Sequence, residues 1–390
     1  MHITKDEEKI LQGELGETKR KSMELLVALG DLSDADRLIP ISSAQVSGAS
    51  FKTISRAGVE FLEEFAIDAK VSVKTTLNPI GMDRDTWKEL GIPAGFAVMQ
   101  KRILDAYDKM GIELTCTCTP YFIGNRPNPG DTIAWAESSA VVFANSVLRA
   151  RTNKEGGPSA LAAAIIGKTP RFGLHIDENR RPTVGIRIEK ALASSDYTLL
   201  GHAIGRKIGQ DVPIIVGIDP TEDEHKALGA AMAASGAASM YLHDRDVNAC
   251  ESFETIDDVI SIESHDLNES KDSLSTASDD VDIIAVGCPH LSIKEMIDMA
   301  QFLKNRHPSN KCKAWFCVSR DVARHCPDEV HVLKKFGNVA CDTCMVVAPL
   351  EEIAGTTGTD SAKAATYLPT LCKQKVWFAN RKNLLELISK

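Results

Sequence analysis

The strongest constraint on the fold of this chain is the alternation of short apolar runs with segments of helix length. It is clearest in the second half of the sequence. The predicted order there is a strand at 212–217, a helix at 221–235, a strand at 238–243, a strand at 281–287, a helix at 292–306 and strands at 314–318, 339–347 and 376–379. Strands separated by helices pair in parallel, because the chain must cross back over the sheet between them. We therefore predict an α/β fold of several mainly parallel sheets with flanking helices.

The first half contains similar elements in a less regular order. Thr4 and Glu7 have the spacing of a capping box, which predicts a helix from there to about Gly30. Ser292 and Glu295 have the same spacing at the start of the helix predicted at 292–306. Residues 112–119 read as a strand, and residues 172–188 suggest a hairpin. We expect these elements to belong to the same α/β architecture.

Residues 251–280 depart from the alternating pattern. They contain ten Asp or Glu residues and one Lys, together with many Ser residues. Such a run of charge is typical of a solvated face. We therefore expect an acidic excursion or a domain junction here and not a binding site.

Bulk composition restricts the functions open to the chain. Its 390 residues are 43% hydrophobic and 25% charged, as in ordinary globular proteins. No apolar run approaches the ~20 residues that cross a membrane, and the acidic N-terminus does not resemble a secretory signal. The formal net charge of −9 argues against nucleic-acid binding, which needs a basic surface. We expect a cytoplasmic protein with no membrane and no nucleic-acid partner, in which a local cationic pocket for a small anion is still allowed.

Ten cysteines exceed what routine core packing requires in a chain that is not expected to form disulfides. Cys118, Cys288 and Cys344 share one context, because each lies at or near the end of a predicted strand. Ligands of open α/β sheets bind beyond the carboxyl ends of strands, so three thiols at such an edge would be able to converge. Their separations of 170 and 56 residues exclude a local zinc finger or a ferredoxin-like run.

Closer cysteine pairs leave another kind of site open. Cys341 and Cys344 form a CxxC, a spacing that also binds zinc or cycles as a redox pair. A structural zinc site usually has a second tight pair, and Cys116 and Cys118 are too close for an ordinary zinc knuckle. The remaining five cysteines are expected to be buried or surface thiols: Cys250, Cys312, Cys317, Cys326 and Cys372.

The number of thiolates decides what an iron–sulfur cluster does. A 4Fe–4S cluster normally takes four thiolates. With three, one iron keeps an open position and acts as a Lewis acid on a substrate hydroxyl or carboxylate. That chemistry suits the elimination of water.

Several motifs, in the same order along the chain, resemble those of the aconitase X family. They are CTPY at 118–121 with Gly124 and Asn125, AWAESSAV at 134–141 with the following 144–146 and 151–153, GCPHLS at 287–292 with Glu295, DTC at 342–344, and SAK at 361–363 with YLP at 367–369. The resemblance implies an aconitase-like fold of several mainly parallel sheets around a central cluster cleft. It also implies dehydration at an iron–sulfur cluster held by three cysteines.

Carried over by motif, the implied cluster ligands are Cys118, Cys288 and Cys344. A 4Fe–4S cluster is expected, and a 2Fe–2S centre on three thiolates stays open as an alternative. Two activities of the family compete. The archaeal two-subunit enzyme dehydrates mevalonate 5-phosphate to trans-anhydromevalonate 5-phosphate, and bacterial relatives dehydrate cis-3-hydroxy-L-proline.

The resemblance also implies a protein partner. In the aconitase superfamily a swivelling domain supplies the serine thought to act as the base. Residues 1–390 correspond to the other three domains, and the end of the chain soon after a helix at 383–389 leaves no room for the swivelling domain. We expect that domain on a separate small subunit of about 130 residues, which would make the enzyme a heterodimer.

One motif departs from the family pattern. Family members often carry Thr-Asn-Ser-Gly-Lys where residues 359–363 of this chain read TDSAK. The Asp adds a negative charge and the Ala replaces a flexible Gly, so we expect a weaker anion-binding role for this loop and for Lys363.

Further polar residues are candidates for binding a small anionic substrate. They are Ser42, Ser43, Gln45, Ser47, Thr75, Thr76, Asn78, Asn125, Glu137, Ser138, Asn145, Arg151, Lys154, His290 and Lys363. Unpaired polar groups cost about 1–3 kcal/mol when buried, which favours a site for those in apolar surroundings. An arginine can also grip a carboxylate or phosphate with two hydrogen bonds. Polar turns, satisfied core networks, solvated loop charges and simple packing of His290 are the alternative interpretations.

These observations together predict the large catalytic subunit of a hydro-lyase whose base comes from the small subunit. Mevalonate 5-phosphate is the preferred substrate, because the large subunit forms a chain of its own and its N-terminal sequence resembles that of archaeal family members. Dehydration of cis-3-hydroxy-L-proline is the first alternative. A non-enzymatic zinc- or RNA-binding regulator is the second.

Overall fold

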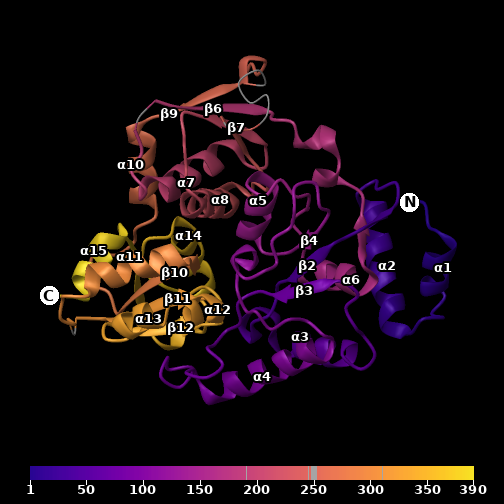
Figure 1. Ribbon diagram of the computed structural model, residues 1–390, viewed down its shortest axis with the longest axis horizontal. Helices are drawn as coiled ribbons and strands as arrows, with labels where there is room; N and C mark the ends of the chain where they lie inside the picture. Colours follow the sequence, from indigo (N-terminus) through magenta and orange to yellow (C-terminus); the bar gives the residue numbers. More distant parts are fainter. Residues whose placement is uncertain (190, 245, 247–252, 310) are drawn as a thin grey trace. The chain divides into compact units, whose positions relative to one another are not determined.

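The helices and strands of the chain are labelled in Figure 1. The computed structural model describes residues 1–189, 191–244, 246, 253–309 and 311–390. Two compact units share these residues, each with its own sheets. Unit 1 comprises Met1–Pro79 and Gly95–Arg181, and unit 2 comprises Ile80–Ala94 and Pro182–Lys390.

Unit 1 is organised around a small parallel sheet. Its central strand β2 (Ser43–Val46) pairs with β3 (Lys74–Leu77) on one side and with β4 (Ala134–Trp135) on the other. All four residues of β2 are buried. Nearby, β1 (Leu38–Pro40) and β5 (Lys168–Pro170) form an antiparallel pair.

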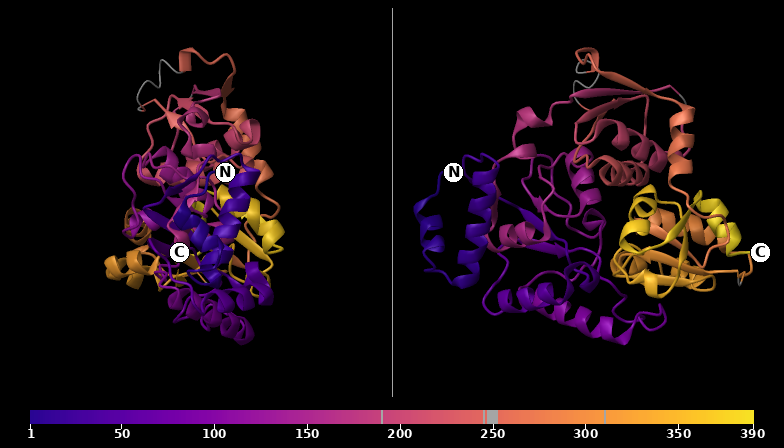
Figure 2. Two further views of the ribbon diagram at one scale, coloured as in Figure 1. Left: turned by 90° about the vertical axis from the view of Figure 1, so that its right-hand side faces the viewer. Right: turned by 180° about the vertical axis from the view of Figure 1, so that it is seen from behind.

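Helices cover this sheet and fill the core of unit 1. The two N-terminal helices, α1 (Lys5–Leu11) and α2 (Glu17–Leu32), lie side by side, as the indigo pair in Figure 1 and in the right-hand view of Figure 2 shows. The buried helix α6 (Gly157–Ile166) packs on α2 and β2. The other elements are α3 (Phe51–Phe65), α4 (Ala94–Lys109), α5 (Ser138–Ser146) and short 3-10 turns at Pro120–Phe122, Gly173–His175 and Asp177–Arg180.

Unit 2 contains two parallel sheets among its described residues. The first has the strand order β8 (Leu242–His243), β7 (Pro213–Val216), β6 (Val184–Ile188) and β9 (Val259–Ile262). Three helices accompany it: α7 (Asp196–Ile208), α8 (Glu222–Gly236) and α10 (Ser264–Ser273). Both α7 and α8 also contact helix α14 (Ala362–Leu371) beside the second sheet, which ties the two layers of unit 2 together.

The second sheet of unit 2 has the strand order β12 (Asn338–Cys341), β11 (Lys313–Val318), β10 (Ile283–Leu291), β13 (Thr356–Thr359) and β14 (Lys375–Phe378). Its central strand β10 is apolar over most of its length and buried throughout, as expected for a parallel strand covered on both faces. The helices of this layer are α11 (Ile293–Leu303), α12 (Arg320–His325), α13 (Pro327–Leu333), α14 (Ala362–Leu371) and α15 (Arg381–Leu387).

The α/β prediction is confirmed, and so is the strand and helix order of the second half. The predicted capping boxes at Thr4 and Ser292 are also present, each with its side chain accepting from the third helical residue. Within the described residues, no helix is long and apolar enough to cross a membrane.

Predictions for the first half were less accurate. The single N-terminal helix is wrong, because Gly13 and Gly16 adopt positive φ angles of 81° and 104° and separate α1 from α2. Residues 112–119 do not form a strand, since they make one isolated bridge and Cys116 turns the chain with a φ of 47°. The hairpin at 172–188 is also wrong, because β6 pairs in parallel with distant strands.

The acidic segment at 251–280 is more ordered than its composition predicts. Residues 259–262 form the edge strand β9, and residues 264–273 form α10, which packs on α7. Buried Ile262, Leu267 and Leu274 attach these elements to the core, and among the described acidic side chains Asp266 is buried while the others are exposed. Residues 251 and 252 lie outside the described part of the chain.

Candidate active site

Cys288 lies where the central strand β10 becomes irregular. The pairing of β10 with β11 shifts register between Val286 and Leu291. Gly287 there has a φ of 96°, and a Cβ atom on it would lie 2.2 Å from the carbonyl oxygen of Cys317. Only glycine fits this close approach. The resulting bulge places Cys288 at the wall of a cavity.

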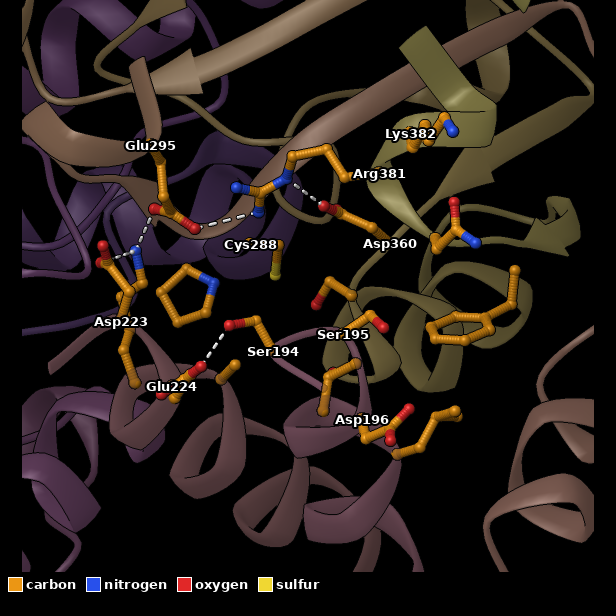
Figure 3. A pocket seen from close by; sticks show the side chains of 18 of the residues that line it. Ser194, Ser195, Asp196, Asp223, Glu224, Cys288, Glu295, Asp360, Arg381 and Lys382 are labelled. Atoms are coloured by element: carbon orange, nitrogen blue, oxygen red, sulfur yellow. Dashed lines mark hydrogen bonds and ion pairs between the residues drawn. The ribbon is translucent and has the colours of Figure 1, made fainter. Parts of the chain in front are cut away.

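This cavity of about 700 Å³ lies within unit 2 (Figure 3). The first turns of several helices line it: Asp196 of α7, Asp223 of α8, Lys294 of α11, the cap residue Ser361 of α14 and Arg381 of α15. The N-terminus of a helix carries a partial positive charge, so these turns favour negative charge in the cavity. Acidic side chains in the same turns already supply part of that charge.

A chain of ion pairs crosses one wall of the cavity. The ammonium of Lys226, 3% exposed, pairs with Glu295 and lies 3.1 Å from Asp223. Glu295 also accepts from Arg381 at 2.9 Å, and Arg381 donates to Asp360 at 2.6 Å. Figure 3 shows Glu295, Arg381 and Asp360 in this order beside Cys288. The chain ties α8, α11 and α15 to the turn before α14.

The ion pairs determine the charge state of Glu295. Burial by itself would raise the pKa of this carboxyl group, but the charges of Lys226 and Arg381 and a backbone hydrogen bond from Ser292 lower it to about 2. Burial opposes the charge of Lys226 in the same way, and Glu295 nevertheless keeps the pKa of Lys226 above its ordinary value. Both side chains are therefore charged at neutral pH.

Asp360 explains the altered motif at residues 359–363. Its carboxylate is paired with Arg381, so the additional negative charge is neutralised within the protein. Lys363 lies in the first turn of α14 and is buried. It does not line the cavity, whereas Asp360 and Ser361 do.

His290 links the Cys288 segment to the Cys344 segment. Its ring is fully buried, and Nε2 donates to the carbonyl oxygen of Thr343 at 2.9 Å. The carbonyl of His290 in turn accepts from Lys226 at 3.2 Å. His290 is thus part of the scaffold that holds the residues next to Cys288 and Cys344, and it does not line the cavity.

Cys344 follows β12 in a buried turn and is 7% exposed. The strand ends at Cys341, six residues before the predicted end at residue 347. Burial raises the pKa of Cys341 to about 12, and the charges of Asp83 and Asp342 add to the effect. Without a bound metal, a thiol in that environment favours its neutral form.

Cys118 belongs to unit 1 and is also nearly buried, at 6% exposure. Its preceding residue Thr117 is held by Gln45, whose Nε2 donates to the Thr117 carbonyl at 3.0 Å. Among the residues that the structure describes, no group of three or more His, Cys, Asp or Glu side chains stands ready to hold a metal. Cys288 and Cys344 lie in unit 2.

The other cysteines fit the expectation of ordinary thiols. Cys317, Cys326 and Cys372 are buried and Cys312 is partly exposed. Cys250 lies outside the described residues.

Unit 1 brings several predicted polar residues together. Asn125 donates to Thr76 at 2.9 Å, and Asn78 donates to Glu137 at 2.8 Å. The buried oxygens Gln45 Oε1 and Asn78 Oδ1 accept no hydrogen bond from any residue in the described part of the chain. Buried acceptors of this kind usually have a partner, so this cluster is suited to a ligand or an ordered water.

Other predicted site residues have structural partners. Asn145 belongs to a satisfied network, because it binds both backbone groups of Thr152 and accepts from Arg180 at 3.1 Å. Arg151 pairs with Asp177 at 2.5 Å, while Lys154 is exposed.

Hydrogen bonds within the protein hold three of the remaining candidates. Ser42 and Thr75 donate to backbone carbonyls, and Ser43 accepts from the Trp135 indole. Ser138 begins α5, and Ser47 is partly exposed just after β2.

Three family models together cover nearly all of the chain. The model of the aconitase X first domain matches residues 1–178, that of the second domain matches 182–272, and that of the third domain matches 281–389. The chain belongs to the aconitase X family. Its second and third family domains both lie in unit 2, and the first lies mainly in unit 1.

Similar proteins cover this aconitase X chain from end to end. The phosphomevalonate dehydratase large subunit of Methanocaldococcus jannaschii is 48% identical over 99% of this chain and 100% of its own length. The crystal structure of Thermococcus kodakaraensis aconitase X, in its holo-form, has a TM-score of 0.91, is 42% identical and covers both chains completely. The cis-3-hydroxy-L-proline dehydratase of Pseudomonas aeruginosa is 32% identical over 97% of this chain and 68% of its own length.

Sequence reasoning missed most of the residues that line the cavity. Glu295 was recognised as half of a capping box, but its second role, pairing with Lys226 and Arg381, was not. The signals for Asp223 and Arg381 were equally local, since Asp223 lies in the first turn of the predicted helix at 221–235 and Arg381 lies just before the predicted helix at 383–389. Several helices begin at this one cavity only because of the tertiary fold, and no periodic pattern in the sequence reveals it.

Proposed function

We propose that this chain is the large subunit of a phosphomevalonate dehydratase, a hydro-lyase. The reaction breaks a C–H and a C–O bond of mevalonate 5-phosphate, forms a C=C bond, and releases water and trans-anhydromevalonate 5-phosphate. The observation that carries this proposal is the 48% identity to a large subunit of that name over the full length of both chains.

An iron–sulfur cluster is the cofactor that the aconitase X family implies, and the cysteines fit it. Thiolates are the usual ligands of such clusters. Cys118, Cys288 and Cys344 are the proposed ligands, and each is nearly buried in its unit. The hydrogen bond between His290 and Thr343 supports this choice, because it holds the Cys288 and Cys344 segments next to each other. When bound by three thiolates, the cluster supplies an iron with an open position that acts as a Lewis acid.

The protein residues would bind and orient an anionic substrate. The cavity beside Cys288 is suited to this role because helix N-termini line it and its strongest charges are fixed by ion pairs. In unit 1, the unpaired acceptors of Gln45 and Asn78 are suited to substrate hydroxyl groups. Lys154, which is exposed in its loop, is a further cation for a carboxylate or phosphate.

The catalytic base is proposed to come from a small subunit that carries a swivelling domain. The name of the Methanocaldococcus relative, a large subunit, supports a smaller partner. The Pseudomonas relative supports it as well, because this chain matches 68% of its length and the rest lies outside the match.

The decisive experiment combines metal analysis with a substrate assay on the reconstituted two-subunit enzyme. We expect a brown protein after anaerobic purification, with turnover of mevalonate 5-phosphate and little turnover of cis-3-hydroxy-L-proline. Turnover of hydroxyproline alone would replace the proposed substrate. Stoichiometric zinc in place of iron would support the regulator that the sequence left as an alternative.

Single substitutions test the ligand assignment. Cys118→Ala, Cys288→Ala and Cys344→Ala should each lower the iron content, because each removes one of three thiolates. Cys326→Ala is the matched control, since Cys326 is also buried but lies outside the proposed set. Iron and labile sulfide per chain are the measured quantities, and equal losses in all four variants would contradict the assignment.

A further inference from the structure

The turn between β12 and Cys344 is held by a buried carboxylate. Asp342 directly follows β12, has a φ of 65° and is fully buried. A left-handed backbone conformation is uncommon for residues other than glycine, although Asp tolerates it better than most. Such a conformation persists where surrounding contacts enforce it. The contacts of Asp342 therefore show what fixes this turn.

Two arginines clamp the carboxylate of Asp342. Arg84 donates from Nε to Oδ2 at 3.0 Å and from Nη2 to Oδ1 at 3.1 Å, which is a bidentate pair. Arg320 donates from Nε to Oδ2 at 3.1 Å and from Nη2 to the same oxygen at 2.5 Å. Charge-assisted and bidentate bonds are stronger and more directional than neutral ones. The clamp thus restrains both the position and the orientation of Asp342.

The residues around Asp342 are anchored by the same segment of unit 2, residues 80–94. The amide of Ile80 donates to the Asp342 carbonyl at 2.8 Å. Asp83 accepts from the Cys341 amide at 2.9 Å and pairs with Arg320 at 3.0 Å. On the following residue, the Thr343 carbonyl accepts from His290. The backbone of each residue from 341 to 343 therefore has a hydrogen-bond partner in unit 2.

We propose that Asp342, clamped by Arg84 and Arg320, is a positioning residue that presents the Cys344 thiol to the cluster. This inference rests on the proposed function, because it takes Cys344 as a cluster ligand. Asp342 lies two residues before Cys344, so a rotation of its turn would move the thiol directly. Residues that orient metal ligands commonly change metal affinity or activity roughly 10- to 100-fold when they are replaced.

Asp342→Asn tests the proposal because it keeps the shape of the side chain and removes its charge. We expect iron to be released to a chelator roughly tenfold faster than from the wild-type protein. The electron paramagnetic resonance spectrum of the reduced cluster should also shift. A merely structural role would lower the melting temperature of the iron-free protein and leave the spectrum and the release rate unchanged. That second result, in a folded variant, would overturn the proposal.

Two further variants keep the test decisive if Asp342→Asn does not fold. Arg84→Gln and Arg320→Gln each leave Asp342 with one guanidinium, and each should give an intermediate release rate and a shifted spectrum. Glu63→Gln is the control, because it breaks another bidentate pair, with Arg102, on the exposed surface of unit 1. Wild-type rates and spectra in both arginine variants would overturn the clamp.

The outcome for the clamp can be separated from that for the proposed function. Wild-type protein that binds iron but does not dehydrate mevalonate 5-phosphate would refute the substrate and leave the clamp to be judged by iron release. Wild-type protein that takes up no iron after reconstitution would overturn the clamp together with the cluster.

Discussion

At the scale of single residues, Glu295 has the environment with the clearest measurable consequence. Its carboxylate lies between the buried ammonium of Lys226 and the half-buried guanidinium of Arg381, and its pKa of about 2 lies below the ordinary value of 4.5. Burial works against the charge, and Lys226 and Arg381 outweigh it. Its ionised state is therefore coupled to folding.

The coupling predicts a pH dependence of stability. Because the pKa of Glu295 is lower in the folded than in the unfolded state, its contribution is complete above about pH 4.5 and is lost as the pH falls towards 2. In Glu295→Gln, the free energy of unfolding at pH 7 should fall by roughly 3 kcal/mol, as expected when one partner of a buried ion pair is removed. Urea titrations between pH 3 and pH 7 measure both effects.

Asp298→Asn provides the comparison for Glu295→Gln. Asp298 pairs with Lys294 on the same helix, and both side chains are mostly exposed, so this ion pair contributes little to stability. Its unfolding free energy should match that of the wild-type protein at each pH. A stability difference for Glu295→Gln that stays constant from pH 7 to pH 3 would contradict the assigned charge state.

Functional residues could be predicted where their role depends on a local motif. They could not be predicted where their role depends on partners far away in the chain. The three cysteines stood out because each is embedded in a family motif. Asp342 lies within one of those motifs, yet its importance depends on Arg84, 258 residues away. Asp360 was expected to weaken anion binding, and only the fold places Arg381 next to it.

At the scale of elements, strand β10 positions the candidate site. It is long, apolar and buried, which made it predictable, and it was expected to end just before Cys288. In the structure β10 continues to Leu291 through a change of register. The bulge at Gly287 allows Cys288 to reach the cavity while the strand stays in the sheet.

Gly287→Ala should disrupt this element. The backbone conformation alone costs about 1–3 kcal/mol for a residue with a side chain, and the added methyl group would meet the Cys317 carbonyl at 2.2 Å. We expect a lower melting temperature and a reduced iron content in the anaerobically purified protein.

Gly95→Ala is the matched control for Gly287→Ala. A Cβ atom on Gly95 in helix α4 would have no atom within 4 Å, and alanine favours helices. This variant should keep the melting temperature and the iron content of the wild-type protein. An unchanged melting temperature in Gly287→Ala would show that the bulge is not constrained as described.

At the scale of the whole molecule, the chain is proposed to be one part of a two-subunit enzyme. It carries the three proposed ligands, while the base is expected from the small subunit. The chain alone should therefore bind iron as well as the two-subunit enzyme does, and it should dehydrate mevalonate 5-phosphate poorly. Iron content and turnover, measured with and without the small subunit, test this.

Addition of the small subunit should restore turnover without changing the iron content. Full turnover by the isolated chain would show that it contains its own base. The expectation of a separate partner would then be wrong even if the substrate were correct.

The sequence by itself determined the α/β class and the family, because both depend on local periodicity and on motifs read in order along the chain. It also singled out the three cysteines as candidate ligands. The tertiary structure decided which helices begin at the cavity beside Cys288, which ion pairs fix its charges and which arginines hold the turn before Cys344. These contacts join residues far apart in the chain, and their energies depend on distance and burial, which exist only after folding.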